Sequence, residues 1–471
     1  MTQSVDAPST PEPPVVLHRL HPLSPLLRGW KAFTALAAYG IADAAPRILS
    51  GDLEGRRPAS VLIAGGFFGV ALLGAAAYGV LSWRFTRYAI HAGDLRIDTG
   101  VLFRQSRRVR LDRVQAVDVV RPLLARALGL AELRLEVAGG SKTEAPLAYL
   151  SEEDAHRLRA ELLARAAGLG ESTPEAPERL MYVVPDGRLL AANLLQIPVV
   201  LALLLGAVFA AAAVFAEPVG APFVLIPAVG SVALTFGRQF AANQGFTLAE
   251  SPDGLRIRRG LLETRAQTVP PGRIQAVRLI EPVLWRLTTG WARLEVEVAG
   301  YTAAGDNAAS AVLLPVAARA DCVALMERVL PGANVAGTAL TGVPRRARWL
   351  DPVAGRGLAA GGDERYFVTR RGALRRETDV MPHERVQSVR AHQGPLQRLL
   401  RLASVTLDTT PGPITVSAEH RDAGEALQLV ERQARLARTA RARAVAEQWM
   451  RASDRADAAV DGTSAGLGDG Q

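Results

Sequence analysis

The chain has 471 residues, a formal net charge of +9 and one cysteine, Cys322. A single cysteine excludes an intrachain disulfide, and the length exceeds that of an ordinary single domain, so we expect several domains. The positive charge by itself would suit nucleic-acid binding. However, the arginines are spread along the chain without a recognition helix, a set of zinc ligands or an aromatic platform, so we expect no nucleic-acid partner.

The first part of the chain, residues 17–83, contains two apolar stretches, at 30–45 and 58–83. About 20 apolar residues cross the hydrocarbon core of a membrane, and the second stretch carries no charge, so it predicts a transmembrane helix. The first stretch is shorter and carries Asp43. A secretory signal is the alternative there, but the long polar leader before it favours a retained span. We therefore predict transmembrane hairpin 1 at 17–83.

The pattern Arg-(Val/Ile)-Gln-(Ala/Ser)-Val occurs three times, at 113–117, 273–277 and 385–389, and each time an arginine follows the glutamine by eleven positions. Such a shared spacing indicates three copies of one domain. We favour a structural role for these residues, pairing buried backbone groups, over the alternative that the arginines bind a phosphate or carboxylate. The candidates are Arg113, Gln115, Arg126, Arg273, Gln275, Arg286, Arg385, Gln387 and Arg398.

Each copy has the same predicted elements. Two strands joined by a Gly-bearing turn precede the pattern, and alternating apolar and polar residues after it predict a strand with one buried face. An amphipathic helix follows, which in the first copy begins at an N-cap, Ser151. We expect three small β-sandwiches or barrels, each capped by a C-terminal helix, at 84–170, 239–332 and 363–448.

The first two patterns start 160 residues apart and the second and third 112 residues apart, so the second copy contains 48 additional residues. The segment 189–237 has one charged residue, Glu217. It is long enough for two membrane crossings joined by a turn at Glu217, which predicts transmembrane hairpin 2 at 188–238. Linkers are expected at 171–187 and 333–362.

The orientation follows from the short loops, because Lys and Arg mark the cytoplasmic side of a membrane protein. Basic residues precede the first apolar stretch and follow the second, whereas the Glu217 turn has none; the loop 47–57, with three arginines, is an exception. We expect both termini and all three domains on the cytoplasmic side of a bacterial plasma membrane.

The last predicted helix starts at about Ala418 and carries the densest basic run, Arg432, Arg435, Arg438, Arg441 and Arg443, of which the first four are the candidates for lipid contact. A solvated helix face is the favoured interpretation, and a face that contacts anionic lipid is the alternative. The ends of the chain, 1–16 and 449–471, are predicted to be disordered because they are rich in Pro, Gly and polar residues.

Several features resemble the bacterial PH (pleckstrin-homology-like) membrane proteins of the YdbS/YdbT type, over roughly 17–435. They are the entry His21-Pro22-Leu23, two apolar hairpins each followed by a domain, and the run from Arg385 to Leu400 with Gly394-Pro395-Leu396. The resemblance implies a membrane protein of the α+β class, with two transmembrane helical hairpins and three PH-like domains, and a part in envelope defence against antimicrobial peptides. Copies 1 and 2 depart from Gly-Pro-Leu, so the three domains need not share one ligand.

Enzyme signatures are missing from the sequence, which has no Walker-type loop, no paired histidines at metal-ligand spacing and no nucleophile elbow, so we expect no catalysis and no cofactor. Two functions remain. In the first, tandem domains at the cytoplasmic face bind anionic lipid headgroups or a protein, either a related PH-domain membrane protein or a second copy. The alternative, a transport or exclusion device for a hydrophobic peptide, is disfavoured by the few polar residues in the spans.

Overall fold

The computed structural model describes the three repeat copies and part of what lies between them. The described residues are 18–24 in part, scattered positions between 66 and 81, 83–166 without 92–93, 101–103, 111–113 and 138–143, 178–208 without 202–203 and 205, 221–299 without 252–253 and 270, and 311–443 without 411. Two compact units are distinguished. The first comprises Met1–Val114, Leu124–Arg134 and Ala145–Thr173, and the second Gln115–Leu123, Leu135–Glu144 and Pro174–Gln471.

The first unit contains the antiparallel sheet β1-β2-β3-β4, formed by His18–Arg19, Arg87–His91, Asp94–Thr99 and Gln105–Arg110. Helix α4 (Glu152–Ala166) begins at the predicted cap, because the Ser151 hydroxyl accepts a hydrogen bond from the Asp154 amide at 3.1 Å. The first strand, β1, lies in the range that the sequence assigns to hairpin 1. Buried residues of this unit include Tyr88, Leu95, Ile97, Leu158 and Leu162.

Copy 2, in the second unit, consists of four strands, then three strands, then a helix. The strands are β8 (Arg179–Val183), β9 (Thr247–Ser251), β10 (Gly254–Arg259), β11 (Glu263–Val269), β12 (Ile274–Pro282), β13 (Trp291–Val298) and β14 (Ala311–Ala318), and the helix is α9 (Arg319–Val329). Copy 1 has the same order along the chain, completed by β5 (Val114–Pro122), α3 (Leu123–Ala127), β6 (Leu130–Val137) and β7 (Glu144–Ser151).

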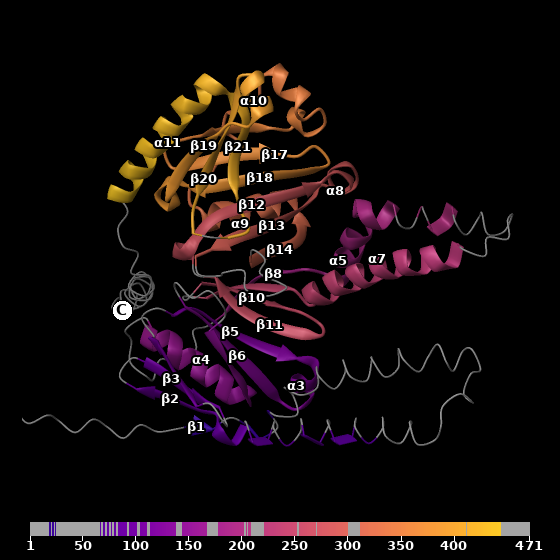
Figure 1. Cartoon of the computed structure of the whole chain (residues 1–471), viewed down its shortest axis with the longest axis vertical. Coiled ribbons are helices and arrows are strands. Elements are labelled where there is room, and N and C mark those ends of the chain that lie inside the picture. The colour runs from indigo at the N-terminus through magenta and orange to yellow at the C-terminus, as the bar shows by residue number, and fades with distance from the viewer. Residues whose placement is uncertain are drawn as a thin grey trace, which may run out of the picture. The chain divides into compact units, whose positions relative to one another are not determined.

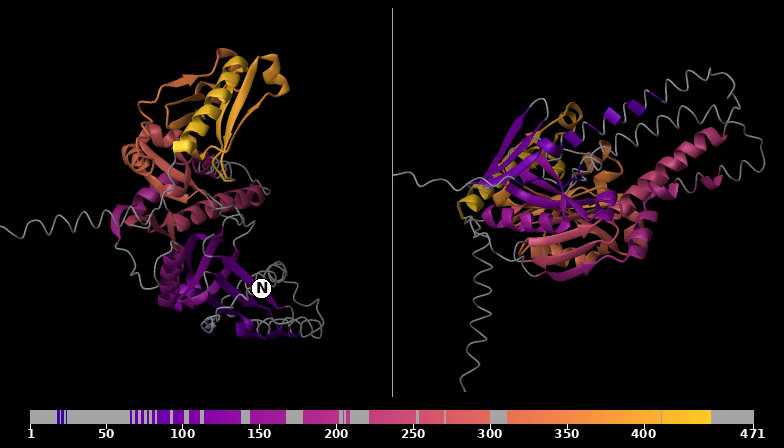
Figure 2. Two further views of the ribbon diagram at one scale, coloured as in Figure 1. Left: turned by 90° about the vertical axis from the view of Figure 1, so that its left-hand side faces the viewer. Right: turned by 90° about the horizontal axis from the view of Figure 1, so that it is seen from below.

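Copy 3 repeats this order and completes the second unit. Its strands are β15 (Leu340–Gly342), β16 (Ala359–Gly362), β17 (Tyr366–Arg371), β18 (Arg375–Pro382), β19 (Ser388–His392), β20 (Leu402–Asp408) and β21 (Val416–Asp422), and its helix is α11 (Ala423–Arg443). Helix α11 packs across the sheet β19-β20-β21 (Figure 1, Figure 2). Strands β8, β15 and β16 fall in the ranges expected to be linkers.

Copies 2 and 3 share one seven-stranded sheet, in the order β14-β13-β12-β18-β17-β16-β15. Strand β12 of copy 2 pairs with β18 of copy 3, with Arg278 opposite Asp379. The Arg278 guanidinium donates to both Asp379 oxygens, at 2.6 and 3.0 Å, and the two side chains are 9% and 1% exposed. Burial is the largest single effect and disfavours the charged guanidinium, but the hydrogen bonds to Asp379 and the charges of Asp379 and Glu377 together outweigh it and raise the pKa of Arg278. This sheet joins two repeat copies into one folded body.

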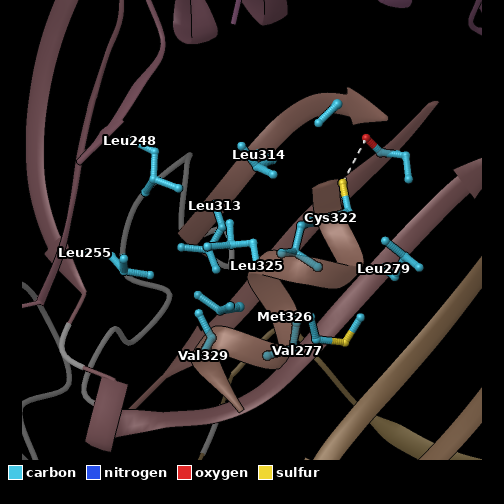
Figure 3. Packing of buried hydrophobic residues seen from close by; sticks show 14 of the residues in the cluster. Leu248, Leu255, Val277, Leu279, Leu313, Leu314, Cys322, Leu325, Met326 and Val329 are labelled. Carbon is cyan, nitrogen blue, oxygen red and sulfur yellow. Dashed lines mark hydrogen bonds between the residues drawn. The ribbon is translucent and has the colours of Figure 1, made fainter. Parts of the chain in front are cut away.

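The core of copy 2 lies between α9 and its strands (Figure 3). Cys322, Leu325, Met326 and Val329 of α9 pack there, and the Cys322 thiol lies 3.7 Å from the Ala292 carbonyl. Cys322 is fully buried at the apolar position that the sequence predicts, and burial raises the pKa of its thiol to about 12. The same core continues into copy 3 through Tyr366, Val368 and Val380.

The apolar insertion of copy 2 lies between its first and second strands. Helices α5 (Asp186–Leu194) and α7 (Ala221–Asn243) follow β8 and lie side by side before β9 (Figure 1). At the same place in copy 3, between β15 and β16, stand only two short 3-10 helices, η3 (Arg345–Trp349) and η4 (Ala354–Arg356). Copy 1 also has its apolar stretches between the first two strands, β1 and β2.

Among the described residues, no single helix is both long and apolar enough to cross a membrane. One bent pair, Asp186–Leu194 with Ile197–Val208 at 63°, meets the length and composition requirement together. The stretch 30–45 lies outside the described residues, and the positions described in 58–83 are helical, with Val70 and Leu73 exposed. In the second insertion the exposed apolar residues include Leu201, Leu204, Val208 and Leu234.

Candidate anion-binding pocket at the junction of two repeat copies

A pocket of about 490 Å³ lies where copies 2 and 3 meet. Copy 2 contributes the end of α9 and the connection from β11 to β12, and copy 3 contributes the turn before β17, the segment after β18 and the end of α11. The charged residues that line it are Arg328, Glu364, Arg365, Glu384, Arg385 and Arg443. Four arginines and two glutamates therefore line one site.

Local turns position the copy 3 residues of this pocket. The Asp363 carboxylate accepts hydrogen bonds from the amides of Arg365 and Tyr366, both at 2.7 Å, which fixes the turn that carries Arg365. The Tyr366 hydroxyl donates to the Pro331 carbonyl at 2.9 Å and so ties β17 to the end of α9. Gly332 has a φ of +86°, and a Cβ there would lie 3.3 Å from Arg365 Nη1, so glycine permits both the backbone conformation and the close approach.

The pocket arginines differ in their partners. Arg328 is held by Glu250 of β9 through three hydrogen bonds of 2.7 to 3.2 Å. Arg385 Nε lies 3.3 Å from Glu384 Oε1. Within the part of the chain that the structure describes, the side chains of Arg365 and Arg443 make no hydrogen bond or ion pair. Planar guanidinium groups bind phosphate and carboxylate through paired N–H donors, so the site is chemically suited to an anion.

In copy 3 the sequence candidates separate into one pocket residue and two surface residues. Arg385 lines the pocket. Gln387 is exposed, and its backbone amide donates to the Asp408 carbonyl at 2.8 Å. Arg398 is exposed on helix α10 (Pro395–Leu399), away from the residues that line the pocket.

In copy 2 the candidates pair with the backbone. Gln275 is buried in β12, and its Nε2 donates to the carbonyl of Arg273, which lies in the 3-10 turn η2 (Pro271–Arg273), at 3.1 Å. Arg286 lies on helix α8 (Val283–Thr288) and donates to the Ala373 carbonyl of copy 3 at 2.7 Å. Burial, followed by the charge of Arg376, lowers the pKa of Arg286. Both side chains therefore donate to backbone carbonyls.

Copy 1 provides less information on its candidates. Arg113 lies outside the described residues, and Gln115 belongs to β5. Arg126 is exposed on α3. The candidates that the structure describes do not form a shared ligand site in the three copies.

The basic run of the last helix lies on the solvent side of α11. Its buried residues are Ala426, Gln433 and Ala437. All four predicted arginines, Arg432, Arg435, Arg438 and Arg441, are exposed.

The sequence interpretation missed Arg328, Arg365, Tyr366 and Arg443 as site residues. Arg443 belongs to the predicted basic run, at the end of the same helix, but is not among its candidates for lipid contact. The other three come from the end of α9 and the start of β17, which approach one another only because copies 2 and 3 share a sheet. Within the described ranges, no group of three or more His, Cys, Asp or Glu side chains could hold a metal ion.

Comparison with known proteins identifies a family pattern over most of the chain. The profile of the family described as "Bacterial PH domain" matches residues 35–166, 192–331 and 329–437. The chain is also similar to the UPF0699 transmembrane protein YdbT of Bacillus subtilis (strain 168), with 27% identity over 252 residues. This alignment covers 46% of the chain and 51% of that protein, so the chain spans about half the length of the curated relative it matches.

Proposed function

Because this chain belongs to the bacterial PH domain family, we propose that it is a membrane-bound interaction protein whose tandem PH-like domains bind anionic groups, foremost lipid headgroups, at the cytoplasmic face of the plasma membrane. PH domains are interaction modules without catalytic chemistry, in keeping with the absence of enzyme motifs from the sequence. The observation that carries the proposal is the pocket between copies 2 and 3, which four arginines line.

Attachment to the membrane by two helical hairpins is part of the proposal. The exposed leucines and valines of the two insertions support it, because such side chains are stable against lipid and costly in water. The similar protein from Bacillus subtilis is named a transmembrane protein. Four spans, with both termini and all three domains in the cytoplasm, fit the distribution of basic residues in every loop except 47–57.

Copy 3 has a second feature that suits a membrane surface. In the place where the other copies carry apolar insertions, its η3 segment exposes Trp349 to 85%, next to Arg345, Arg346 and Arg348. Tryptophan and basic residues concentrate at membrane interfaces, where the ring meets the headgroups and the cations meet anionic lipid. The exposed arginines of α11 would add to this attraction.

The transport alternative finds no support in the described polar residues of the second insertion. Gln196 Nε2 donates to Asn193 Oδ1 at 3.0 Å and to Gln239 Oε1 at 3.1 Å, which ties the helices to each other. Asn193 Nδ2 donates to the Leu189 carbonyl at 2.9 Å. These groups satisfy one another in the protein, and a structural role accounts for them.

The anion-binding proposal is tested with the purified full-length chain in a non-ionic detergent. Soluble dioctanoyl phosphatidylglycerol, dioctanoyl phosphatidylcholine and inorganic phosphate are titrated, and binding is followed by thermophoresis. We expect preferential binding of phosphatidylglycerol, weakened at least about tenfold by Arg385→Ala or Arg443→Ala, since a hydrogen bond to a charged group contributes about 1.5–3 kcal/mol. Arg157→Ala, an exposed arginine on α4 of copy 1, is the matched control. Equal affinities in all variants would reject the pocket as the binding site.

A physiological role in protecting the envelope against antimicrobial peptides extends the same proposal. Cells that depend on the wild-type chain should survive a membrane-active cyclic peptide better than cells with the Arg385→Ala, Arg443→Ala double variant at equal protein level. Equal survival would separate headgroup binding from protection.

A further inference from the structure

Copies 2 and 3 are joined by a strand pairing that also occurs a second time in the chain. The first strand of the three-stranded part of one copy, β12, pairs with the fourth strand of the next, β18. In the same way, Val119–Pro122 of β5 pair antiparallel with Glu263–Ala266 of β11, inside the second unit. Counted from the arginine that begins the repeat pattern in each copy, the two pairings have the same register. At both junctions, therefore, the strand that contains the repeat pattern pairs in the same way with the fourth strand of the next copy.

Copy 3 has the same edge without a strand on it. Its counterpart of β12 is β19, which is the end strand of the sheet β19-β20-β21 within the described residues. Strand β12 is buried from Ile274 to Glu281, whereas four of the five residues of β19 are exposed. An open strand edge presents backbone donors and acceptors that can pair with an added strand.

The helix through which copy 2 contacts copy 3 has a counterpart in copy 3, and this counterpart makes no such contact with the described residues. In copy 2, Arg286 donates to the Ala373 carbonyl, and the Val283 amide donates to the Leu374 carbonyl, so α8 contacts the β17–β18 turn. The counterpart of Arg286 is Arg398 on α10, whose exposed side chain makes no hydrogen bond to any described residue. Leu396 of the same helix is 64% exposed.

A third set of contacts, made by a carboxylate and an arginine near this edge, differs between copies 2 and 3. In copy 2, the buried Glu297 carboxylate accepts hydrogen bonds from the Thr409 hydroxyl (2.8 Å) and the Ile414 amide (3.0 Å) of copy 3. Its counterpart in copy 3 is Asp408, which instead accepts from Arg390 Nε and Nη2, both at 2.6 Å. Arg390 is the counterpart of Arg278. The two residues that reach across the junction in copy 2 are thus paired with each other in copy 3.

From these observations we infer that β19 and α10 of copy 3 form a docking surface for a PH-like domain of a different polypeptide. That domain adds its fourth strand to β19 as β18 adds to β12. Arg390 then exchanges Asp408 for a carboxylate of the incoming strand, at the position that Asp379 holds opposite Arg278. The turn of the incoming hairpin contacts Arg398 and Leu396 of α10.

The charge pattern selects a different polypeptide over a second copy of this chain. The position of Asp379 lies six residues before the repeat-pattern arginine, Arg385, and the corresponding residue before Arg113 is Arg107, on β4. Strand β4 also carries Arg108 and Arg110. Pairing β4 of one chain with β19 of another would place Arg107 opposite Arg390, and like charges directly opposite each other destabilise a strand pair. The occupant therefore has Asp or Glu where β4 has Arg107.

The test uses the full-length chain in detergent and a labelled peptide with the sequence of residues 366–382, the β17–β18 hairpin, as the probe. Fluorescence anisotropy should show saturable binding that Arg390→Glu weakens at least about tenfold, the effect of roughly 1.4 kcal/mol. A peptide with Asp379→Lys should bind the wild type weakly and the Arg390→Glu variant well. Arg438→Glu, a charge reversal on the exposed face of α11, should leave binding unchanged.

Three results would overturn the inference. The first is no peptide binding to the wild-type chain, and the second is equal binding to wild type and Arg390→Glu without rescue by the charge-swapped peptide. The third is concentration-dependent self-association in sedimentation velocity that Arg390→Glu abolishes, which would assign the surface to a second copy. The rescue by the swapped peptide separates a lost contact from a misfolded variant. None of these outcomes depends on the anion pocket.

Discussion

Arg278 and Asp379 form a buried ion pair across the shared sheet, so loss of either partner leaves a charge in the interior. We expect Asp379→Ala to lower the free energy of unfolding by about 3–5 kcal/mol, measured by urea denaturation with tryptophan fluorescence. The matched control is Asp408→Ala, which removes the exposed pair with Arg390 and should leave the denaturation midpoint nearly unchanged. Equal effects of the two substitutions would mean that burial of the first pair is unimportant.

His383 is fully buried in copy 3, and its Nε2 lies 3.1 Å from the Asp363 carbonyl. Burial lowers the pKa of His383, so the folded state resists protonation. The stability that this neutral histidine contributes is fully present above the ordinary pKa of about 6.5 and is lost as the pH falls through the lower folded-state pKa. Melting temperatures between pH 8 and 5 should therefore decline.

The decline should be smaller in His383→Gln, which does not titrate. His392→Gln, on the exposed strand β19, should keep the wild-type decline. An unchanged pH profile in His383→Gln would show that another group controls acid stability.

Two glutamines of the repeat pattern differ in burial in a way that the sequence does not predict. Gln275 and Gln387 occupy the same place in the repeat pattern, yet Gln275 is buried and Gln387 is exposed. The strands at these positions also differ, because β18 pairs with β12 from Val277 onward, whereas no described strand pairs with the outer edge of β19. The sequence surroundings of the two glutamines are alike and cannot predict this difference.

Among the elements, α8 and α10 provide a direct comparison of an occupied and an open junction. Arg286→Ala should cost about 1–2 kcal/mol of unfolding free energy, because it removes a hydrogen bond from a charged group to the Ala373 carbonyl. Arg398→Ala, at the same place in copy 3, should have no effect on the isolated chain. Chemical denaturation of both variants measures the difference, and a similar loss in both would contradict a junction role for Arg286.

Several elements follow from local sequence, and others do not. The start of α4 at Ser151 follows from a side-chain cap that sequence alone reveals. Helix α11 starts at Ala423 rather than near Ala418, because β21 continues to Asp422, whose carboxylate accepts from the Gly424 amide at 2.9 Å. Strand β16 has the sequence Ala-Ala-Gly-Gly, without alternation, and becomes a strand only by pairing with β15 and β17.

Copy 3 also shows a shift of the expected hairpin. The turn at Gly372 joins the third and fourth strands, β17 and β18, whereas in copies 1 and 2 the expected hairpin joins the second and third strands, β2 with β3 and β9 with β10. The offset arises because β16, the second strand of copy 3, has no recognisable strand pattern. Turn residues alone therefore show where a hairpin lies but not which strands of the repeat form it.

At the scale of the molecule, copies 2 and 3 share a sheet and a core, so they should unfold together. Leu325→Ala in α9 should cost about 2–4 kcal/mol through the cavity it creates. Because the core reaches Val368 and Val380, amide hydrogen exchange should accelerate in β17 and β18 of copy 3 as well as in copy 2. Leu427→Ala, at a position 64% exposed, is the control. Faster exchange confined to copy 2 would indicate independent folding.

Three repeats were predictable from the spacing of a five-residue pattern, whereas the sheet that runs through copies 2 and 3 was not. Strand pairing between copies depends on contacts such as Arg278 with Asp379, which lie 101 residues apart in the sequence. The pocket depends on the same junction, since Arg328 and Arg365 meet only when β12 and β18 pair. A single sequence contains no periodicity that reports such a contact.

The place of the insertions has a consequence for how this repeat can diversify. The ends of the first loop are fixed as neighbours by strand pairing, Arg19 with Arg87, Val183 with Thr247 and Gly342 with Ala359. Closing a longer loop between ends already held together costs little entropy, because the cost grows only with the logarithm of its length. The same β-fold therefore accepts a long apolar segment or a short polar one in that loop. Duplication of one ancestral unit, followed by gain or loss of the loop segment, is enough to produce both kinds of copy.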